Sequence, residues 1–180
     1  MPFLLSALLL AAAAAPPHAF DLKEGTLSYT VVHKLHEVKG TTHALEGRAL
    51  VQPSGALRVQ VRAKIASFDS GNSNRDEHVR EVTHEPLHPY VQIKGSAAGL
   101  PLAVSAPVDV TLDGTIELNG VQKEQPIAVH LEPQPGGVRA RFSFSISLDA
   151  FKVERPELLF VQVDDKAVIA GELVFAEAGK

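Results

Sequence analysis

The feature that most constrains the fold is a strict alternation of apolar and polar residues. In "LRVQVRAKI" (57–65) and "VRARFSFSISL" (138–148), every second residue is apolar and the residues between them are charged or polar. Successive side chains of a β-strand point to opposite faces, so this period predicts antiparallel strands with one face buried and one in water. The same pattern predicts six further strands, at residues 27–35, 43–51, 91–95, 108–118, 127–131 and 167–175.

Turn signals separate most of these strands, among them "QPSG", "LNG" and "QPGG". Eight strands that each have one apolar face must either stack as a sandwich or close into a barrel. Closure removes exposed edges, which favours an all-β, eight-stranded antiparallel barrel. The interior of such a barrel is filled by side chains or holds one elongated ligand. No internal repeat or second domain is evident, so a single domain over residues 20–180 is expected.

The first 19 residues, "MPFLLSALLLAAAAAPPHA", contain no Lys, Arg, Asp or Glu. Their apolar run, residues 4–15, has the length of a secretory h-region and is shorter than the roughly 20 residues that span a bilayer. We therefore expect residues 1–19 to be a signal peptide cleaved after Ala19, and the mature protein to be periplasmic or secreted. A membrane anchor is the alternative, because the basic n-region is missing.

Composition excludes several classes of function. The chain has no cysteine, which rules out thiolate catalysis, dithiol redox chemistry, cysteine metal clusters and a lipoprotein acyl anchor. A net charge of −4 gives no basic footprint for nucleic acid. The nucleophile elbow GxSxG, the Walker loop and the dinucleotide motif GxGxxG are all absent from the sequence, so we expect a protein that is not an enzyme and needs no cofactor.

One segment breaks the two-residue period. "SFDSGNSNRDEHVREVTHEPLHPY" (67–90) packs three histidines and five acidic residues into 24 positions. Asn74 followed by Glu77 resembles an N-terminal capping box, with Ser73 as the alternative cap. A helix over about residues 75–84 is expected, and Pro86 forces its end. This helix would close one end of the barrel.

The histidines of this segment raise the question of a metal site. His84 and His88 are four apart, but Pro86 lies between them, so they do not share a regular helical face. His33 and His36 are three apart on a predicted strand and would point to opposite faces. Solvated polar residues are therefore the favoured interpretation, and a histidine-based zinc site is the alternative. No metal is predicted.

Two other histidines are expected inside the barrel. By alternation, His33 shares a face with the apolar residues of 27–35, and His43 shares a face with those of 45–51. Each is interpreted either as a core histidine satisfied by a hydrogen bond or as a polar group that meets the head group of a ligand.

The segment "SFDSGNSNRDEHVRE" resembles the hallmark TGN-x-x-RD-x-H of the YceI-like proteins, with Ser70 in place of threonine. Upstream, "YTVVHKLHEVKGTTHALEGRALV" resembles the opening hairpin of the family with its central glycine, here Gly40. Downstream, "LDGTIELNGVQKEQPIAVHL" and "FSISLDAFKVERPELLFVQVDDKAVIAGELVF" are similar to its later strands. The resemblance covers residues 22–175 in order.

The resemblance implies a lipocalin-like barrel, open through the middle, that holds a long isoprenoid chain. Members are typically exported bacterial proteins that bind polyprenyl pyrophosphates or isoprenoid quinones, often as homodimers. It therefore implies a non-enzymatic carrier whose only membrane contact is transient, for lipid exchange. The residues that match the motif are interpreted as a hydrogen-bonded clasp that holds the helix at the barrel end, with Arg75 able to contact an anionic head group: Gly71, Asn72, Arg75, Asp76 and His78.

The sequence departs from the family where many members carry a phenylalanine pair after the helix; "VTHE" stands there instead. Two other functions stay open: a metal-binding or metal-stress protein that uses surface histidines, and an interaction module with a filled barrel. Alternation and the resemblance together predict the lining of a lipid tunnel, namely Leu27, Tyr29, Val31, His33, His43, Val59, Val61, Ile65, Phe142, Phe144, Ile146, Leu173 and Phe175.

Overall fold

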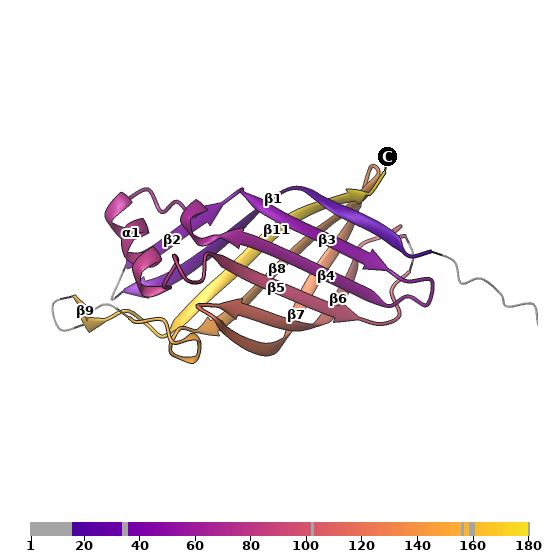
Figure 1. Ribbon diagram of the computed structural model, residues 1–180. Helices are drawn as coiled ribbons and strands as arrows, with labels where there is room; N and C mark the ends of the chain where they lie inside the picture. Colours follow the sequence, from indigo (N-terminus) through magenta and orange to yellow (C-terminus); the bar gives the residue numbers. More distant parts are fainter. Residues whose placement is uncertain (1–15, 34–35, 102, 156, 159–160, 180) are drawn as a thin grey trace, which may run out of the picture.

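A computed structural model describes residues 16–33, 36–101, 103–155, 157–158 and 161–179. Its antiparallel strands wrap into an elongated barrel with a helix at one end (Figure 1). The barrel strands are β1 (His18–His33), β2 (His36–Thr42), β3 (Leu45–Val51), β4 (Leu57–Lys64), β5 (Tyr90–Ala97), β6 (Val108–Leu118), β7 (Val121–Gln134), β8 (Gly137–Ser147) and β11 (Lys166–Glu177). The smaller elements are η1 (Ile65–Ser67), α1 (Ser73–Val82), η2 (Asp149–Phe151), β9 (Glu157–Leu158) and β10 (Val161–Gln162).

The sheet closes on itself. Its strands follow the order β11-β8-β7-β6-β5-β4-β3-β1, and β1 pairs back with β11. Strands β2 and β3 lie end to end along the same side of β1. The pairing of β1 with β3 ends at Asp21↔Arg48, and its pairing with β2 begins at Leu27↔Thr42. The predicted closed, eight-stranded antiparallel barrel is therefore confirmed.

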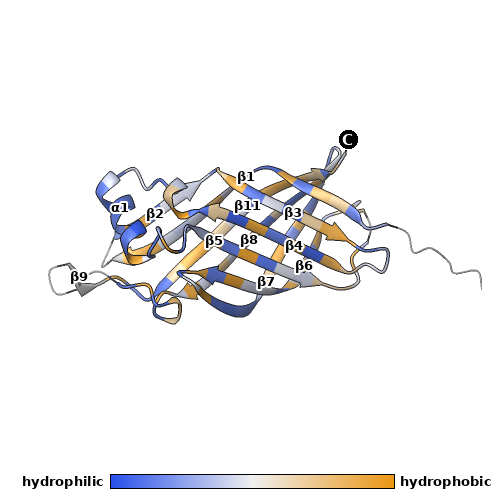
Figure 2. Cartoon of the chain, in the orientation of Figure 1, coloured by the Kyte–Doolittle hydropathy of each residue, from blue (hydrophilic) through white to orange (hydrophobic). Residues whose placement is uncertain are grey.

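Alternation places the apolar side chains inside. Along β3, β4 and β5, hydrophobic and hydrophilic residues form successive bands (Figure 2). The inward residues include Ala63 and Ile127, each 1% exposed, and Ile116 at 2%. The outward residues are polar, as on β8, where Arg141 donates to Glu132 at 2.7 Å and to Glu172 at 3.0 Å. Exposed ion pairs of this kind contribute little to stability, so burial in the interior holds the barrel together.

The inward face changes phase at two places that the sequence pattern does not reveal. Strand β1 has a register shift between Leu22 and Glu24 where it pairs with β11. Beside β1, the neighbouring wall formed by β2 and β3 is interrupted at residues 43 and 44. His43 lies in that interruption and is exposed, so its predicted inward orientation was wrong: the alternation had been extended across the break.

Strand β2 was not among the strands predicted by alternation, because "HEVKGTT" offers only one large apolar residue. Gly40, expected at the centre of the hairpin, instead lies within β2 opposite Tyr29. A Cβ at Gly40 would come 2.4 Å from Cε1 of Tyr29. The glycine therefore makes room for the tyrosine ring to lie on the inner wall.

At one end of the barrel, which we call the helix end, lie α1, the β6–β7 turn and η2 (Figure 1). The β6–β7 turn is Asn119–Gly120, with φ of 51° and 70°. Two consecutive positive φ values define a type I′ turn, whose twist suits a two-residue hairpin. At the far end, the two ends of the described chain come together, and Ala178 N–H donates to the carbonyl of Ala19 at 2.9 Å.

One side of the barrel wall is closed only in part. Strands β7 and β8 pair from Val129↔Phe142 to Gln134↔Gly137. Beyond that, over residues 121–128 and 143–147, which the structure describes completely, no ladder pair joins them. The side chain of Gln125 spans this seam, its Nε2 donating to the carbonyl of Ser145 at 3.4 Å.

Candidate functional site

A cavity of about 530 Å³ lies at the helix end, between the barrel and α1. Pockets of 300–1,000 Å³ typically bind small molecules. Val79 and Val82 of α1 cover it, and Phe68 before the helix also lines it. Six of the predicted tunnel residues line this cavity: Leu27, Tyr29, Val31, Ile65, Phe144 and Ile146.

A second cavity, of about 300 Å³, lies toward the far end of the barrel. Leu100 and Val104 of the β5–β6 connection contribute to its lining. Five other predicted tunnel residues line this cavity: Val59, Val61, Phe142, Leu173 and Phe175. Within the described residues, the predicted lining is thus shared between two cavities, or chambers, where a single tunnel was expected, and the barrel is not filled throughout. The side chain of His33 lies outside the described residues.

Two polar atoms at the helix-end cavity lack hydrogen-bond partners. The hydroxyl of Tyr29 and Nε2 of His78 are buried, and neither has a partner among the described residues. Both side chains line the cavity. An unsatisfied buried polar group costs roughly 1–3 kcal/mol, so its presence calls for an explanation. A ligand with a polar end in this cavity would supply the missing partners.

Burial raises the pKa of Tyr29 above its ordinary value of 10.0. The negative charge of Asp76 raises it further, and the positive charge of Arg75 partly opposes the shift. Loss of a proton in this environment would place a phenolate in an apolar site close to a carboxylate.

This shift predicts a loss of stability at high pH. Because the pKa of Tyr29 is raised in the folded state, its contribution to the free energy of unfolding is complete below pH about 10. That contribution is lost as the pH rises through the folded-state pKa. Ultraviolet titration should show one of the two tyrosines ionising late, with Tyr29→Phe removing that late component. Tyr90→Phe is the matched control and should leave it in place. A late component that persists in Tyr29→Phe would contradict the assignment.

The polar motif before and within α1 is held by its own hydrogen bonds. Oδ1 of Asn72 accepts from the N–H of Arg75 at 3.1 Å, which makes Asn72 the N-cap, not Asn74 or Ser73 as expected. The helix accordingly begins at Ser73 and ends at Val82, about two residues earlier than predicted. Asn72 is the N-cap because its side chain reaches the third N–H of the helix, that of Arg75.

Two further motif side chains, those of Arg75 and Asp76, tie the loop to the helix. Oδ1 of Asp76 accepts from Ser70 N–H at 3.0 Å. Arg75 donates to the Ser70 carbonyl at 2.8 Å and to its hydroxyl at 3.3 Å. Gly71 has φ of 75°, a conformation that favours glycine, and open space beside it. Through Asp69, whose backbone N–H and carbonyl both bond to Thr41, the loop is joined to β2.

The histidines that follow α1 also have structural partners. Nδ1 of His84 lies 2.9 Å from Oδ1 of Asn119. Nδ2 of Asn119 donates to the carbonyls of Phe151 at 3.2 Å and Lys152 at 2.9 Å, so its Oδ1 is the acceptor for His84 N–H. The buried Asn119 thus joins three segments of the helix end, a role that no sequence motif signalled.

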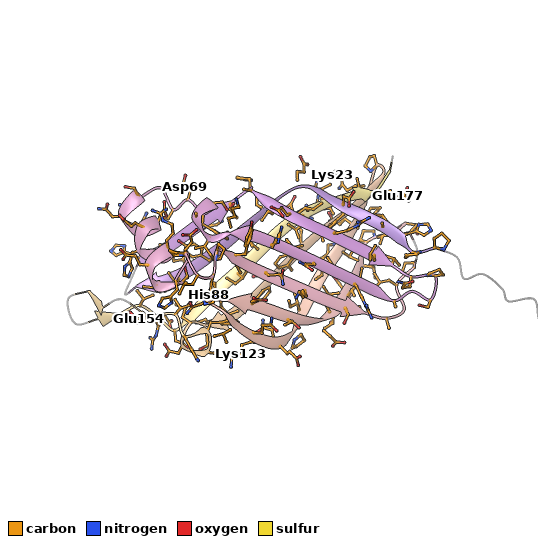
Figure 3. All side chains as sticks on the ribbon, in the orientation of Figure 1. Lys23, Asp69, His88, Lys123, Glu154 and Glu177 are labelled. Carbon is orange, nitrogen blue, oxygen red and sulfur yellow. The ribbon has the colours of Figure 1, made fainter. Side chains whose placement is uncertain are left out.

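His88 packs on the same turn: a Cβ at Gly120 would lie 2.5 Å from its Cε1. Asp69, His88 and Glu154 all lie around the helix end, while Glu177 lies toward the far end (Figure 3). Among the described residues, no group of three or more histidine or acidic side chains is placed to hold a metal ion. No helix in this part of the chain is long and apolar enough to cross a membrane.

The fold has close structural relatives. One is a polyisoprenoid binding domain from Saccharophagus degradans implicated in plant cell wall breakdown, with a TM-score of 0.70 and 12% identity over 88% of this chain and 98% of that one. Burkholderia cenocepacia BcnA has a TM-score of 0.70 and 17% identity over 83% and 95%. The Campylobacter jejuni YceI protein has a TM-score of 0.63 and 16% identity over 82% and 88%.

At these identities the structural likeness establishes the fold alone. A search of the curated proteins finds no match. The sequence itself matches the YceI-like domain over residues 18–175, which covers every strand of the barrel up to β11. The chain therefore belongs to the YceI-like family.

Proposed function

We propose that this protein is a non-enzymatic binding protein that holds an isoprenoid lipid, a polyprenyl phosphate or pyrophosphate or an isoprenoid quinone, inside its barrel. The observation that carries the proposal is the apolar helix-end cavity with two unpartnered polar atoms on its wall. Burying an alkyl chain there stabilises the complex by about 0.8 kcal/mol per CH₂ group. The polyisoprenoid binding domain among the structural relatives supports this choice of ligand class.

In this proposal the head group lies at the helix end. Tyr29 and His78 offer it hydrogen bonds, and Arg75, which also lines the cavity, offers the N–H groups not used by Ser70. The hydrocarbon chain lies deeper, against Phe144 and Ile146. Fixed polar groups at one end of an apolar pocket orient a ligand of this kind.

Export belongs to the same proposal. Cleavage after Ala19 would remove only the first two residues of β1 and keep its pairing with β11, which begins at Phe20↔Glu177. The mature protein would then act in the periplasm or outside the cell, as a monomer or homodimer that touches membranes only to exchange lipid. N-terminal sequencing of the exported protein would test the cleavage site.

Native mass spectrometry with organic extraction, on mature protein purified without a histidine tag, tests the function. We expect a bound species whose mass corresponds to a chain of isoprene units carrying a phosphate or quinone head. A protein that carries no lipid, and that takes up neither prenyl phosphates nor quinones when they are offered, would refute the proposal.

A further inference from the structure

The two cavities adjoin inside the barrel, since they share a lining residue. Among the described residues, Ile93 alone lines both of them. On β8 the boundary falls between two successive inward residues, since Phe142 lines the far cavity and Phe144 lines the helix-end cavity. Their rings stack with centroids 5.9 Å apart. The ring of Phe142 therefore stands at the border between the chambers.

Two inward glycines make the packing at this border possible. A Cβ at Gly171 would lie 2.4 Å from Cζ of Phe142, so that ring lies directly over the backbone of β11. In the same way a Cβ at Gly114 would lie 2.5 Å from Cδ1 of Ile127, which is 1% exposed. We call Ile93, Gly114, Ile127, Phe142 and Gly171 the waist of the barrel.

The members of the waist differ in how tightly they are held. Ile127 and Ile93 are buried, at 1% and 8% exposed, and Ile127 packs against β6. Phe142 is only partly buried, because its ring borders the far cavity. It is also the largest side chain of the waist. Of the waist side chains, Phe142 is therefore the one whose truncation frees the most volume at the border of the two cavities and exposes the least buried surface.

We propose that Phe142 sets the length of the isoprenoid chain that the protein accepts. With the ring in place, a chain that enters from the helix end stops at the waist. Without the ring, the chain can continue into the far cavity of about 300 Å³, whose lining is apolar. This inference rests on the proposed function, since it assigns a selectivity to the same lipid site.

The test compares farnesol, geranylgeraniol and solanesol, prenyl alcohols of increasing length, in competition for the mature protein by native mass spectrometry. For Phe142→Ala we expect the preference for solanesol over farnesol to rise at least tenfold, because each additional buried CH₂ is worth about fourfold in affinity. Phe142→Leu, which keeps most of the core volume, should shift the preference in the same direction by less. Val104→Ala, in the β5–β6 connection, enlarges the far cavity without opening the waist and should leave the preference unchanged.

The outcomes separate the two proposals. If Phe142→Ala and Phe142→Leu both bind prenyl alcohols with the chain-length preference of the native protein, the waist does not select chain length. That result would overturn the role of the waist without contradicting the proposed lipid site. An equal shift in Val104→Ala would overturn it as well, because volume alone would then be responsible. Failure of the native protein to bind any of the three alcohols, or any prenyl phosphate or quinone, would overturn the proposed function itself.

Discussion

Replacing Asn119 by alanine is expected to lower the free energy of unfolding by roughly 3 kcal/mol, which corresponds to a fall in Tm of about 10 °C for a chain of this size. The change removes the amide that donates to the carbonyls of Phe151 and Lys152 and accepts from His84, leaving buried groups without partners. It also places alanine at a φ of 51°, which asparagine tolerates better. Thermal and urea denaturation would measure the loss.

Two variants separate these causes. Asn119→Gly keeps the positive φ and loses only the side-chain hydrogen bonds, so it should be less destabilising than alanine. Asn72→Ala removes an asparagine hydrogen bond that is exposed, at the N-cap of α1, and should cost only about 1 kcal/mol. If Asn119→Ala proves no more destabilising than Asn72→Ala, Asn119 does not hold the helix end together.

The second large effect is expected at Phe144. Arginine at this inward position would bring a charge into the apolar helix-end cavity, against the chain of any bound lipid. An unpaired charge in such a site costs several kcal/mol, so we expect lipid affinity to fall by roughly a hundredfold or more. Lipid retained after purification, measured by native mass spectrometry, is the readout, and circular dichroism would verify that the variant is folded.

Ser145→Arg is the matched control, since it adds the same charge one residue further along β8, at an exposed position. It should leave lipid binding within about twofold of the native protein, because exposed charges perturb their surroundings weakly. Full-strength binding by folded Phe144→Arg would show that the lipid does not occupy this cavity.

Much of the fold could be predicted from sequence because alternation is a local property of each strand. In β4 and β8 the period of two assigns every residue to a face without knowledge of any partner strand. The period of two assigns residues to the wrong face where a strand is interrupted. His43 is the example, because nothing in "GTTHALEG" marks the interruption between β2 and β3. Phase breaks depend on the register with β1, which only the assembled sheet reveals.

The site was harder to predict than the fold, because its decisive contacts join distant parts of the chain. "LNG" signals a turn, yet the carbonyls bound by Asn119 lie 32 and 33 residues away. The division of the interior into two chambers depends on a ring of β8 that covers a glycine of β11. Such a contact follows from cross-strand register, and a pattern that only distinguishes inward from outward residues does not contain it.

The seam between β7 and β8 has a mechanical consequence. Elsewhere, parting neighbouring strands of a closed barrel breaks a row of backbone hydrogen bonds, each worth about 1 kcal/mol net. Over residues 121–128 and 143–147 there is no such row to break, and one long side-chain bond from Gln125 crosses the gap. Beside Phe144, β7 and β8 could therefore part without breaking a row of backbone hydrogen bonds, while the pairing of β8 with β11 stays intact.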